Sequence, residues 1–468
     1  MRSFCCILMA AIVLCYISGC TKTQRSDDLY VSSAIERRLD KKVLWSKGCT
    51  KEQIESRIQT LLQEELSIDD AVQISFLNNP HIQAIFEEIG ISQADLVEAG
   101  LFSNPVFDLF VRYPDKKNFV TNIEYSITAS FIDLFLIPLR VKVAKAELEQ
   151  TTLRVTNEVL DLAFEVEQTY YQLQAARQEL NYTRSIVELS SIQSEIATRQ
   201  RDIANINSLD FQQTQSRFLQ SKLEITTIEN EIIRLKEKLN KLLGFSGDIE
   251  WAIPNELPEI DYQGLPIESL ESVSLRERLD LQIARFEVLR LSRMLGIKQW
   301  WVYTKGYVGI GGERDPDGLN TLGPAFSGEI PIFNYGQGAR LRLQAELRQA
   351  HDELATLEIR ILSEVREAHK LLMNNLEVIK DYRDQIIPLQ NKILASSEEL
   401  YNVMGLGIDH LLEAKREELL VYSKYVLSLR NYWMARVQLD RALGGKLYKV
   451  FAYESEPTPC YCTEGATE

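Results

Sequence analysis

The residue types that most often perform chemistry are scarce in this chain and do not cluster. The four histidines are His81, His351, His369 and His410, and their spacing matches neither an HExxH pair nor a zinc-ligand set. The chain has no G-x-S-x-G and no P-loop. Gly309-Ile310-Gly311-Gly312 leads into a turn, which argues against a nucleotide fingerprint. The sequence therefore predicts no catalytic residue, no metal site and no cofactor.

Four of the seven cysteines lie in the first twenty residues. An apolar run from Phe4 to Ile17 is too short to span a bilayer but suits a secretory signal. The run ends in Ile17-Ser18-Gly19-Cys20, which resembles a bacterial lipobox, and Thr21 follows rather than the aspartate that favours inner-membrane retention. We expect a lipoprotein signal peptide over residues 1–19 and lipidation of Cys20. The alternative is an ordinary signal peptide with a chance cysteine.

The three remaining cysteines are Cys49, Cys460 and Cys462. In an oxidising periplasm they could form disulfides, and the sequence leaves the pairing open. The alternative for Cys460 and Cys462 is a soft-metal site, which a histidine nearby would have favoured.

The charge of the chain excludes one class of partner. The net charge is −15 and the pI is about 5.0, and no basic stripe stands out, so we expect no nucleic-acid binding. After the signal no apolar stretch reaches about eighteen residues, so we expect no transmembrane helix. Any entry into a membrane would use strands.

The second half of the sequence repeats the first at an offset of about 199–200 residues. Ala146-Glu147-Leu148 returns as Ala345-Glu346-Leu347, and Leu243-Gly244 returns as Leu443-Gly444. We also match Asp210 with Asp409. The predicted division is an N-terminal extended segment 20–66, a first repeat 67–245, a Pro-containing linker 246–266, a second repeat 267–445 and a C-terminal tail 446–468.

The sequence predicts several long helices, which would position the functional residues. Residues 139–202 read as one helix without Pro or Gly, about 95 Å long, which exceeds any ordinary globular domain. A second helix ends at Gly244. The apolar stripe is broad and rich in small and polar residues, which favours a curved helical wall over a two-stranded coiled coil. Further helices are predicted over 267–297, 337–404, with a kink at Pro388, and 409–443.

Four segments between the helices alternate with a period of two. They cover 105–113, 121–131, 300–310 and 322–332, each about ten residues long, as in outer-membrane strands. The alternative is two amphipathic hairpins in a soluble domain. We expect the prolines Pro324 and Pro331 at strand ends or bulges.

Four strands cannot close a barrel, and lipid does not tolerate an open sheet edge. Membrane barrels start at about eight strands. A homotrimer would supply about twelve, so we predict a trimer. Tyr113, Trp300 and Trp301 would then suit an interfacial aromatic girdle.

Several short motifs occur in a fixed order. They are Leu66-Ser67-Ile68-Asp69-Asp70-Ala71-Val72, Leu77-Asn78-Asn79-Pro80, Ala204-Asn205-Ile206-Asn207-Ser208-Leu209-Asp210, Leu239-Asn240-Lys241-Leu242-Leu243-Gly244, Leu275 to Leu281, and Glu329-Ile330-Pro331-Ile332-Phe333-Asn334-Tyr335-Gly336. In this order the chain resembles the TolC-type outer membrane efflux protein family over nearly all of its mature length.

The resemblance implies a mainly α fold with a membrane β-barrel part and an internal two-fold sequence repeat. A trimeric outer-membrane β-barrel, with four strands per chain, would continue into a long periplasmic α-helical barrel. The partners implied are a periplasmic adaptor (membrane fusion) protein, an inner-membrane pump of RND or ABC type, and outer-membrane lipid. The implied function is the exit duct of a tripartite efflux system for drugs or metal ions.

The resemblance also places the adaptor contacts and the closing aperture at the helix-hairpin breaks. Asp210 and Tyr401 align with a contact between coils that holds related channels shut, whereas Leu406 replaces an arginine. His410 and Glu413 align with acidic aperture positions, and only Glu413 keeps the carboxylate. Three copies of Glu413 would form a cation-attracting ring; the alternative is a solvated carboxylate at a helix start. The expected tip residues are Asn205, Asn207, Asp210, Tyr401, Gly405, Leu406, Asp409, His410 and Glu413.

Two further functions stay open. A duct for type I protein secretion would share this architecture, because the pump selects the cargo. A periplasmic coiled-coil adaptor or scaffold would not need lipid-facing strands.

Overall fold

The computed structural model describes residues 27–39, 51–116, 118–247, 249–258, 260, 266–298, 306–329 and 332–447. The predictions for the signal peptide, for lipidation of Cys20 and for the cysteine pairing lie outside the described residues. The same holds for the girdle tryptophans Trp300 and Trp301 and for Pro331.

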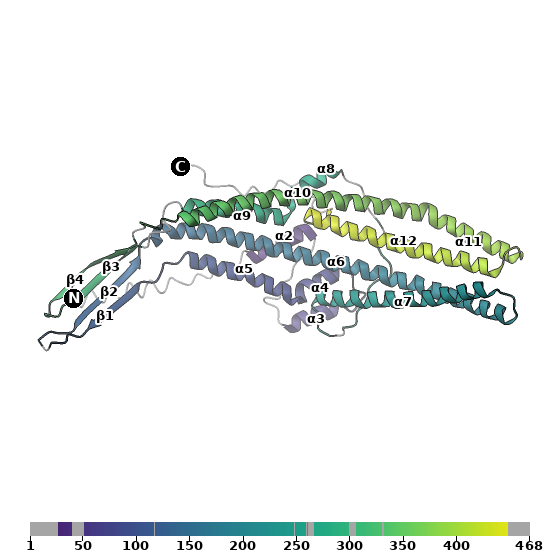
Figure 1. Ribbon diagram of the computed structural model, residues 1–468, viewed down its shortest axis with the longest axis horizontal. Helices are drawn as coiled ribbons and strands as arrows, with labels where there is room; N and C mark the ends of the chain where they lie inside the picture. Colours follow the sequence, from purple (N-terminus) through teal and green to yellow (C-terminus); the bar gives the residue numbers. More distant parts are fainter. Residues whose placement is uncertain are drawn as a thin grey trace.

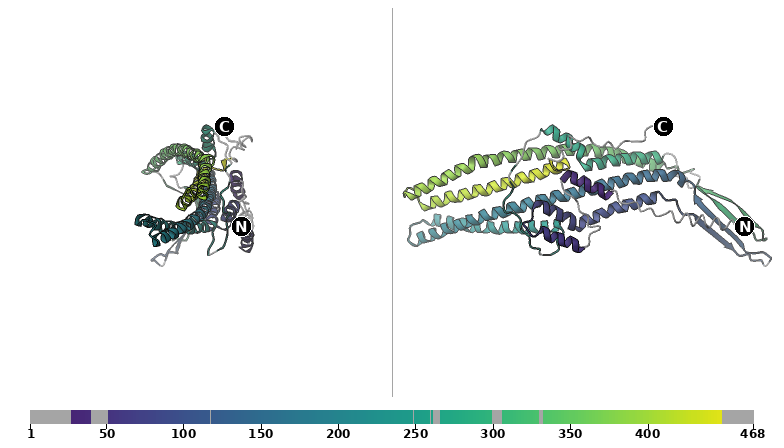
Figure 2. Two further views of the ribbon diagram at one scale, coloured as in Figure 1. Left: turned by 90° about the vertical axis from the view of Figure 1, so that its right-hand side faces the viewer. Right: turned by 180° about the vertical axis from the view of Figure 1, so that it is seen from behind.

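The molecule is elongated, with a small sheet at one end and two helix-hairpin turns at the other (Figure 1). Viewed along its length, the long helices form an open crescent (Figure 2). Two N-terminal helices, α2 (Asp27–Leu39) and α3 (Lys51–Leu61), lie on the convex side.

The two halves of the chain have the same order of elements. The first half contains α4 (Ile68–Asn78), α5 (Pro80–Ala99), β1 (Val106–Arg112), β2 (Asn122–Ser130), α6 (Asp133–Asp202) and α7 (Ser208–Leu243). The second contains α8 (Ile267–Glu277), α9 (Leu279–Lys298), β3 (Gly306–Arg314), β4 (Asn320–Gly328), α10 (Gln337–Asp381), the π-helical turn η1 (Tyr382–Ile386), α11 (Ile387–Asn402) and α12 (Ile408–Leu443).

The N-terminal segment differs from the expected extended chain. Val31, Ile35 and Leu39 repeat every four residues along α2 and are fully buried in the main core. The main core also contains side chains of α4, α5, α6 and α7. The apolar spacing therefore folds this part into a helix that closes the core.

The long helix α6 has 70 residues, about 105 Å of continuous helix. Its buried face contains hydroxyl side chains that bond to their own helix: Thr152 to the carbonyl of Leu148 (2.8 Å) and Ser190 to that of Ile186 (2.8 Å). Because these groups are satisfied locally, α6 can bury a mixed face between neighbouring helices.

The predicted single helix 267–297 is wrong, because Arg278 is extended and separates α8 from α9. The first half has the same break at Asn79, where Pro80 begins α5. Pro80 makes that break visible in the sequence, whereas Leu279 offers no such signal. Arg278 is held instead by ion pairs with Asp280 and Glu364.

Each helix break packs on the end of the hairpin in its own half. Asn78 Nδ2 donates to the carbonyl oxygens of Leu243 (3.0 Å) and Gly244 (2.8 Å), and Asn79 Nδ2 donates to that of Leu242 (3.0 Å). These bonds satisfy carbonyls at the end of α7 that the helix itself leaves free. Gly244 has a φ of +74°, the left-handed conformation common after a helix.

The four strands form one antiparallel sheet in the order β1-β2-β3-β4. The second hairpin differs from its predicted bounds, 300–310 and 322–332. Glu313 and Arg314, expected in the turn, pair with Glu124 and Ile123 and extend β3. Pro324 lies inside β4, opposite Ile310, rather than at a strand end as predicted, and β4 is the last strand of this four-stranded sheet.

The linker between the halves is bound at alternate carbonyls. The carbonyl of Ala252 accepts from Leu66 N (2.8 Å). Those of Pro254 (3.0 Å) and Glu256 accept from Gln174 Nε2, and that of Pro258 accepts from Trp433 Nε1 (3.2 Å). This chain of contacts crosses from α6 to α12 and holds the two halves together.

Candidate functional site

The two hairpin tips have turns of the same backbone shape. Ala204 and Met404 are both left-handed, with φ of 56° and 58°. The following amide turns back to the preceding helix in both: Asn205 N bonds to the Gln200 carbonyl (2.8 Å) and Gly405 N to the Leu400 carbonyl (2.8 Å). Both turns therefore adopt a conformation that costs energy for residues other than glycine.

The helices that leave the two turns are capped differently. Asn207 Oδ1 accepts from Asp210 N (2.8 Å), and Asn207 Nδ2 donates to Asp210 Oδ2 (2.6 Å). In the second turn Gly407 occupies the cap position and supplies no side chain. Counted from these caps, Asp210 corresponds to His410, so the match of Asp210 with Asp409 is wrong by one position.

The predicted tip residues lie on two separate hairpins. Asn205 and Asp210 are exposed on the α6–α7 turn, and Asp409 and His410 are exposed at the start of α12. Tyr401 lies in the last turn of α11, and its carbonyl accepts from Met404 N (3.0 Å). Gly405 is exposed and Leu406 is half-buried in the same turn. The predicted contact between Asp210 and Tyr401 of neighbouring coils stays a prediction.

Glu413 connects the two hairpins within one chain. Its carboxylate accepts from Arg416 Nη1 (2.7 Å) on α12 and lies 3.9 Å from Arg217 Nη1 on α7. Two arginines therefore compensate its charge in this arrangement, and the predicted ring of three Glu413 carboxylates stays a prediction.

The tips also expose apolar side chains, which the sequence analysis did not select. Ile203 is 73% exposed and Met404 is 95% exposed, and Val403 and Leu209 are exposed beside them. Four exposed apolar residues therefore gather at this end of the molecule. Their place at the two breaks between helices was the available signal.

The sheet has one apolar face. In one row of the register Phe107 pairs with Ile127, Ile127 with Ile310, and Ile310 with Pro324. The next row contains Leu109, Tyr125, Gly312 and Leu322. The alternation predicted from the sequence therefore places apolar side chains on one face across all four strands.

The other face of the sheet carries most of its polar side chains, together with Val106 and Phe110, and several of the polar groups bond to one another. Arg112 Nη2 donates to Glu124 Oε2 (3.1 Å), and Asn122 Nδ2 donates to Glu313 Oε1 (2.7 Å). Glu124 and Glu313 are direct cross-strand partners. Like charges in this position repel, so Arg112 and Asn122 stabilise the pair. The sequence analysis missed this cluster because its members meet only through the register of β2 and β3.

Aromatic and apolar residues surround the junction between the sheet and the helices. Tyr113, predicted for a girdle, is exposed at the far end of β1. At the near end the exposed residues are Leu101, Phe102, Phe131, Leu134, Phe135, Ile332, Phe333 and Tyr335. Aromatic residues at both ends of an apolar band suit a membrane with two interfaces.

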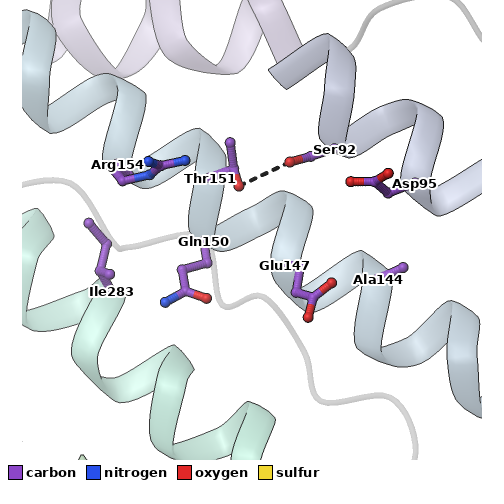
Figure 3. Close-up of a pocket in the computed structure, with 8 residues that line it drawn as sticks. All are labelled: Ser92, Asp95, Ala144, Glu147, Gln150, Thr151, Arg154 and Ile283. Carbon is purple, nitrogen blue, oxygen red and sulfur yellow. Dashed lines mark hydrogen bonds between the residues drawn. The ribbon is translucent and has the colours of Figure 1, made fainter. Parts of the chain in front are cut away.

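A cavity of about 380 Å³ lies between α5, α6 and α9 (Figure 3). Ser92 Oγ donates to Thr151 Oγ1 (3.1 Å) across it. Glu147, which lines it, lies 3.5 Å from Arg290, and the hydrogen bond from Arg290 lowers the pKa of Glu287. Because its charges are paired between helices, we interpret the cavity as a packing seam.

Within the ranges that the structure describes, no group of three or more His, Cys, Asp or Glu side chains is placed to hold a metal ion. None of the helices in the described ranges is both long and apolar enough to cross a membrane.

The family model for outer membrane efflux proteins matches residues 116–245. This range contains β2, α6 and α7. The match confirms the predicted resemblance and supports an outer-membrane location that extends into the periplasm. None of the curated proteins compared with the chain matches it.

Solved structures of membrane proteins, among them one outer membrane channel, share the fold. The Campylobacter jejuni CmeC outer membrane channel aligns with a TM-score of 0.67 at 14% identity, over 81% of this chain and 85% of that one. The Vibrio cholerae outer membrane protein VceC aligns with a TM-score of 0.64 at 14% identity, over 84% of this chain and 98% of that one. A membrane protein from Pseudomonas aeruginosa aligns with a TM-score of 0.66 at 18% identity, over 81% of this chain and 93% of that one.

Proposed function

We propose that this chain, which resembles the outer membrane efflux proteins, is one protomer of a homotrimeric exit duct. The duct would pass small molecules, drugs or metal ions, from a periplasmic adaptor and an inner-membrane pump of RND or ABC type to the exterior. The chain itself would not be an enzyme.

The observation that carries the proposal is the two-faced sheet. Its apolar face suits lipid, and its opposite face carries hydrogen-bonded charged groups such as Arg112, Glu124 and Glu313. This is the distribution of a membrane barrel with a polar interior. In the described residues β1 and β4 are the edges of the sheet. Lipid requires such edges to be paired, and pairing β4 of one copy with β1 of the next closes a ring.

The helical part supports the same assembly. The crescent in Figure 2 is a wall with two free sides, formed by α7 and by α10 and α11. Both sides expose apolar residues: Leu219 and Leu223 on α7, Leu389 and Ile393 on α11. Three crescents joined side to side would cover these residues and enclose a tunnel.

We assign the hairpin tips to the adaptor contact and the aperture. The exposed Ile203, Val403 and Met404 would supply an apolar surface there, and the nine predicted tip residues lie on the same two hairpins. Lipidation of Cys20 would add an anchor to the barrel. Labelling cells with a radioactive fatty acid and comparing a Cys20→Ser variant tests this part alone.

The central test is a trimer that conducts ions. Purified from an outer-membrane fraction, the full chain should run as a heat-modifiable trimer and form ion channels in planar bilayers. A soluble periplasmic monomer would overturn the proposal and favour an adaptor or scaffold. To separate efflux from type I secretion, cells without the chain are assayed for retained drug or metal and for a lost secreted protein.

A further inference from the structure

A cluster of buried charges lies where the end of α12 meets α6. Glu167 of α6 is 4% exposed and Asp440 of α12 is 5% exposed. Beside them Tyr171 stacks on Trp433, with ring centroids 4.9 Å apart. Buried carboxylates are costly unless cations or hydrogen bonds compensate them, so the groups around this pair define the stability of the joint.

The residues directly after α12 supply that compensation. Lys446 Nζ lies 3.0 Å from Glu167 Oε1; the Glu167 side chain is buried, and that of Lys446 is 15% exposed. The next amide, Leu447 N, donates to Asp440 Oδ1 (2.9 Å). Arg436 Nε lies 3.5 Å from the same oxygen. One short segment therefore contacts both carboxylates.

The backbone of this segment is held on both sides. Gly444 is left-handed (φ +80°) and turns the chain back, so that Gly445 N bonds to the Asp440 carbonyl (3.0 Å). Lys446 N donates to the Arg38 carbonyl of α2 (3.0 Å). Leu447 is buried in the core formed by α8, α10 and α12. The segment 444–447 is thus inserted between α12, α6 and α2.

The first half of the chain joins α6 differently. There two ion pairs join α7 to α6: Lys238 with Glu165 (3.1 Å) and Glu229 with Arg184 (3.2 Å). All four side chains are partly exposed. Exposed pairs contribute little to stability, whereas removal of one partner of a buried pair leaves an uncompensated charge. The attachment of α12 to α6 therefore depends on charge far more than the attachment of α7.

We propose that residues 444–447 attach the second hairpin to α6: Lys446 pairs with Glu167, and the Leu447 amide bonds to Asp440. We call this attachment the electrostatic latch. It becomes more stable when the Asp440 carboxyl binds a proton. The latch itself does not depend on the proposed function. Its effect on the aperture does, because α11 and α12 carry one of the two tips.

The proton effect follows from the environment of Asp440. Burial raises the pKa of its carboxyl to about 6, against the lowering effects of Arg436, the Leu447 amide and Lys446. The charge of Glu167 adds to the rise, and Tyr171 lies on the same side of α6. In an opened, solvated joint the carboxyl would titrate near its ordinary value of 3.8. Acidification through about 6 therefore favours the closed joint, and neutral pH weakens it.

The test is hydrogen–deuterium exchange on the full-length protein. Lys446→Met should accelerate exchange in residues 432–447 about tenfold or more, because it leaves Glu167 buried without its lysine. The equivalent end of α7, residues 232–243, should exchange as before. Lys238→Met is the matched control, because it removes the lysine partner of Glu165 on the same long helix, α6; it should leave both segments unchanged.

The double variant Glu167→Gln with Lys446→Met separates charge from lost packing. It should restore slow exchange, because no buried charge is left unpaired. After correction for the intrinsic pH dependence of amide exchange, Asp440→Asn should be as strongly protected at pH 7.5 as the unmodified protein is near pH 5. Its protection should not change on acidification. Equal effects of Lys446→Met and Lys238→Met, or no recovery in the double variant, would overturn the latch.

The effect at the tip is measured separately, by the distance between spin labels at Ile203→Cys and Met404→Cys after Cys49, Cys460 and Cys462 are replaced by Ser. Lys446→Met should broaden this distance distribution at neutral pH. The readout needs neither a pump nor conduction, so a failure of the exit-duct proposal would not imitate a failure of the latch.

Discussion

Ala204 and Met404 occupy the same left-handed position in the two hairpin turns, with φ of 56° and 58°. Neither residue is a glycine or an asparagine, the types that adopt this conformation most easily. The backbone of both turns is therefore slightly strained at this position.

Changing the side chain at this position should change the stability of the tip. Asn tolerates the left-handed region, so Ala204→Asn should stabilise the first turn by roughly 0.5 kcal/mol. Ala204→Val should destabilise it by about 1–2 kcal/mol, since branched side chains resist a positive φ. Amide exchange at residues 200–206 measures both. If the valine variant exchanged as slowly as the asparagine variant, the strain argument would fail.

The helix caps predict a second difference between the tips. Asn207→Ala removes the acceptor for Asp210 N and should cost about 1 kcal/mol. Gly407→Asn should add a cap to α12 and gain a few tenths of a kcal/mol. Thermal unfolding of both variants beside the unmodified protein checks the two signs.

The two helix-end glycines should respond unequally to alanine. A Cβ on Gly244 would lie 2.5 Å from the Asn78 carbonyl oxygen, whereas a Cβ on Gly444 would lie 3.1 Å from that of Glu277. Both positions are left-handed. We expect Gly444→Ala to cost about 1–2 kcal/mol and Gly244→Ala distinctly more, because backbone cannot move aside. The melting temperatures should follow this order.

The apolar face of the sheet predicts how lipid constrains substitution. Ile127→Lys should cost about 2–4 kcal/mol in a membrane barrel and reduce assembly in the outer membrane. Ser126→Lys changes the neighbouring residue on the polar face and should be tolerated. Trimer yield from membrane fractions reports both. Equal loss in the two variants would argue against a lipid-facing side.

The carboxylates Glu124 and Glu313 should influence which ions pass. If they line the barrel interior, Glu313→Gln should shift the reversal potential in a salt gradient toward lower cation preference. Glu195→Gln changes an exposed carboxylate on α6 that pairs with Arg199, and it should leave the reversal potential unchanged. A Glu313→Gln channel with unaltered selectivity would remove these groups from the pore.

Local patterns predicted most of the architecture. Helix ends such as Gly244, and the tip at Asn207, follow from residue types that terminate or cap helices wherever they occur. The alternation in β1 and β2 gave the faces of the sheet for the same reason. These features depend on a few neighbouring residues, so the sequence reveals them.

Features made by distant residues could not be predicted in this way. At the break, Arg278 pairs with Glu364, 86 positions later in the chain, and the extension of β3 depends on pairing with β2. In the sequence, Glu167 and Lys446 cannot be distinguished from ordinary charged surface residues. Only the fold brings them together as an ion pair. Long-range contacts and the register between strands decide such sites.

The π-helical turn η1 adds one residue to a helical turn directly before Pro388. Each residue of a helix advances by about 100°, so the insertion changes the rotational phase of every later side chain in α11. With the rotation that η1 imposes, Leu394 is buried, and Gln390 Nε2 donates to the Ala414 carbonyl of α12 (3.3 Å).

Deleting one residue from η1 would therefore shorten the helix by about 1.5 Å yet rotate its whole distal part by about 100°. Leu394 would turn out of its buried position, and Tyr401 at the tip would point in another direction. A single codon lost far from the aperture would thus redirect every side chain that α11 presents there, while the helix itself stayed continuous.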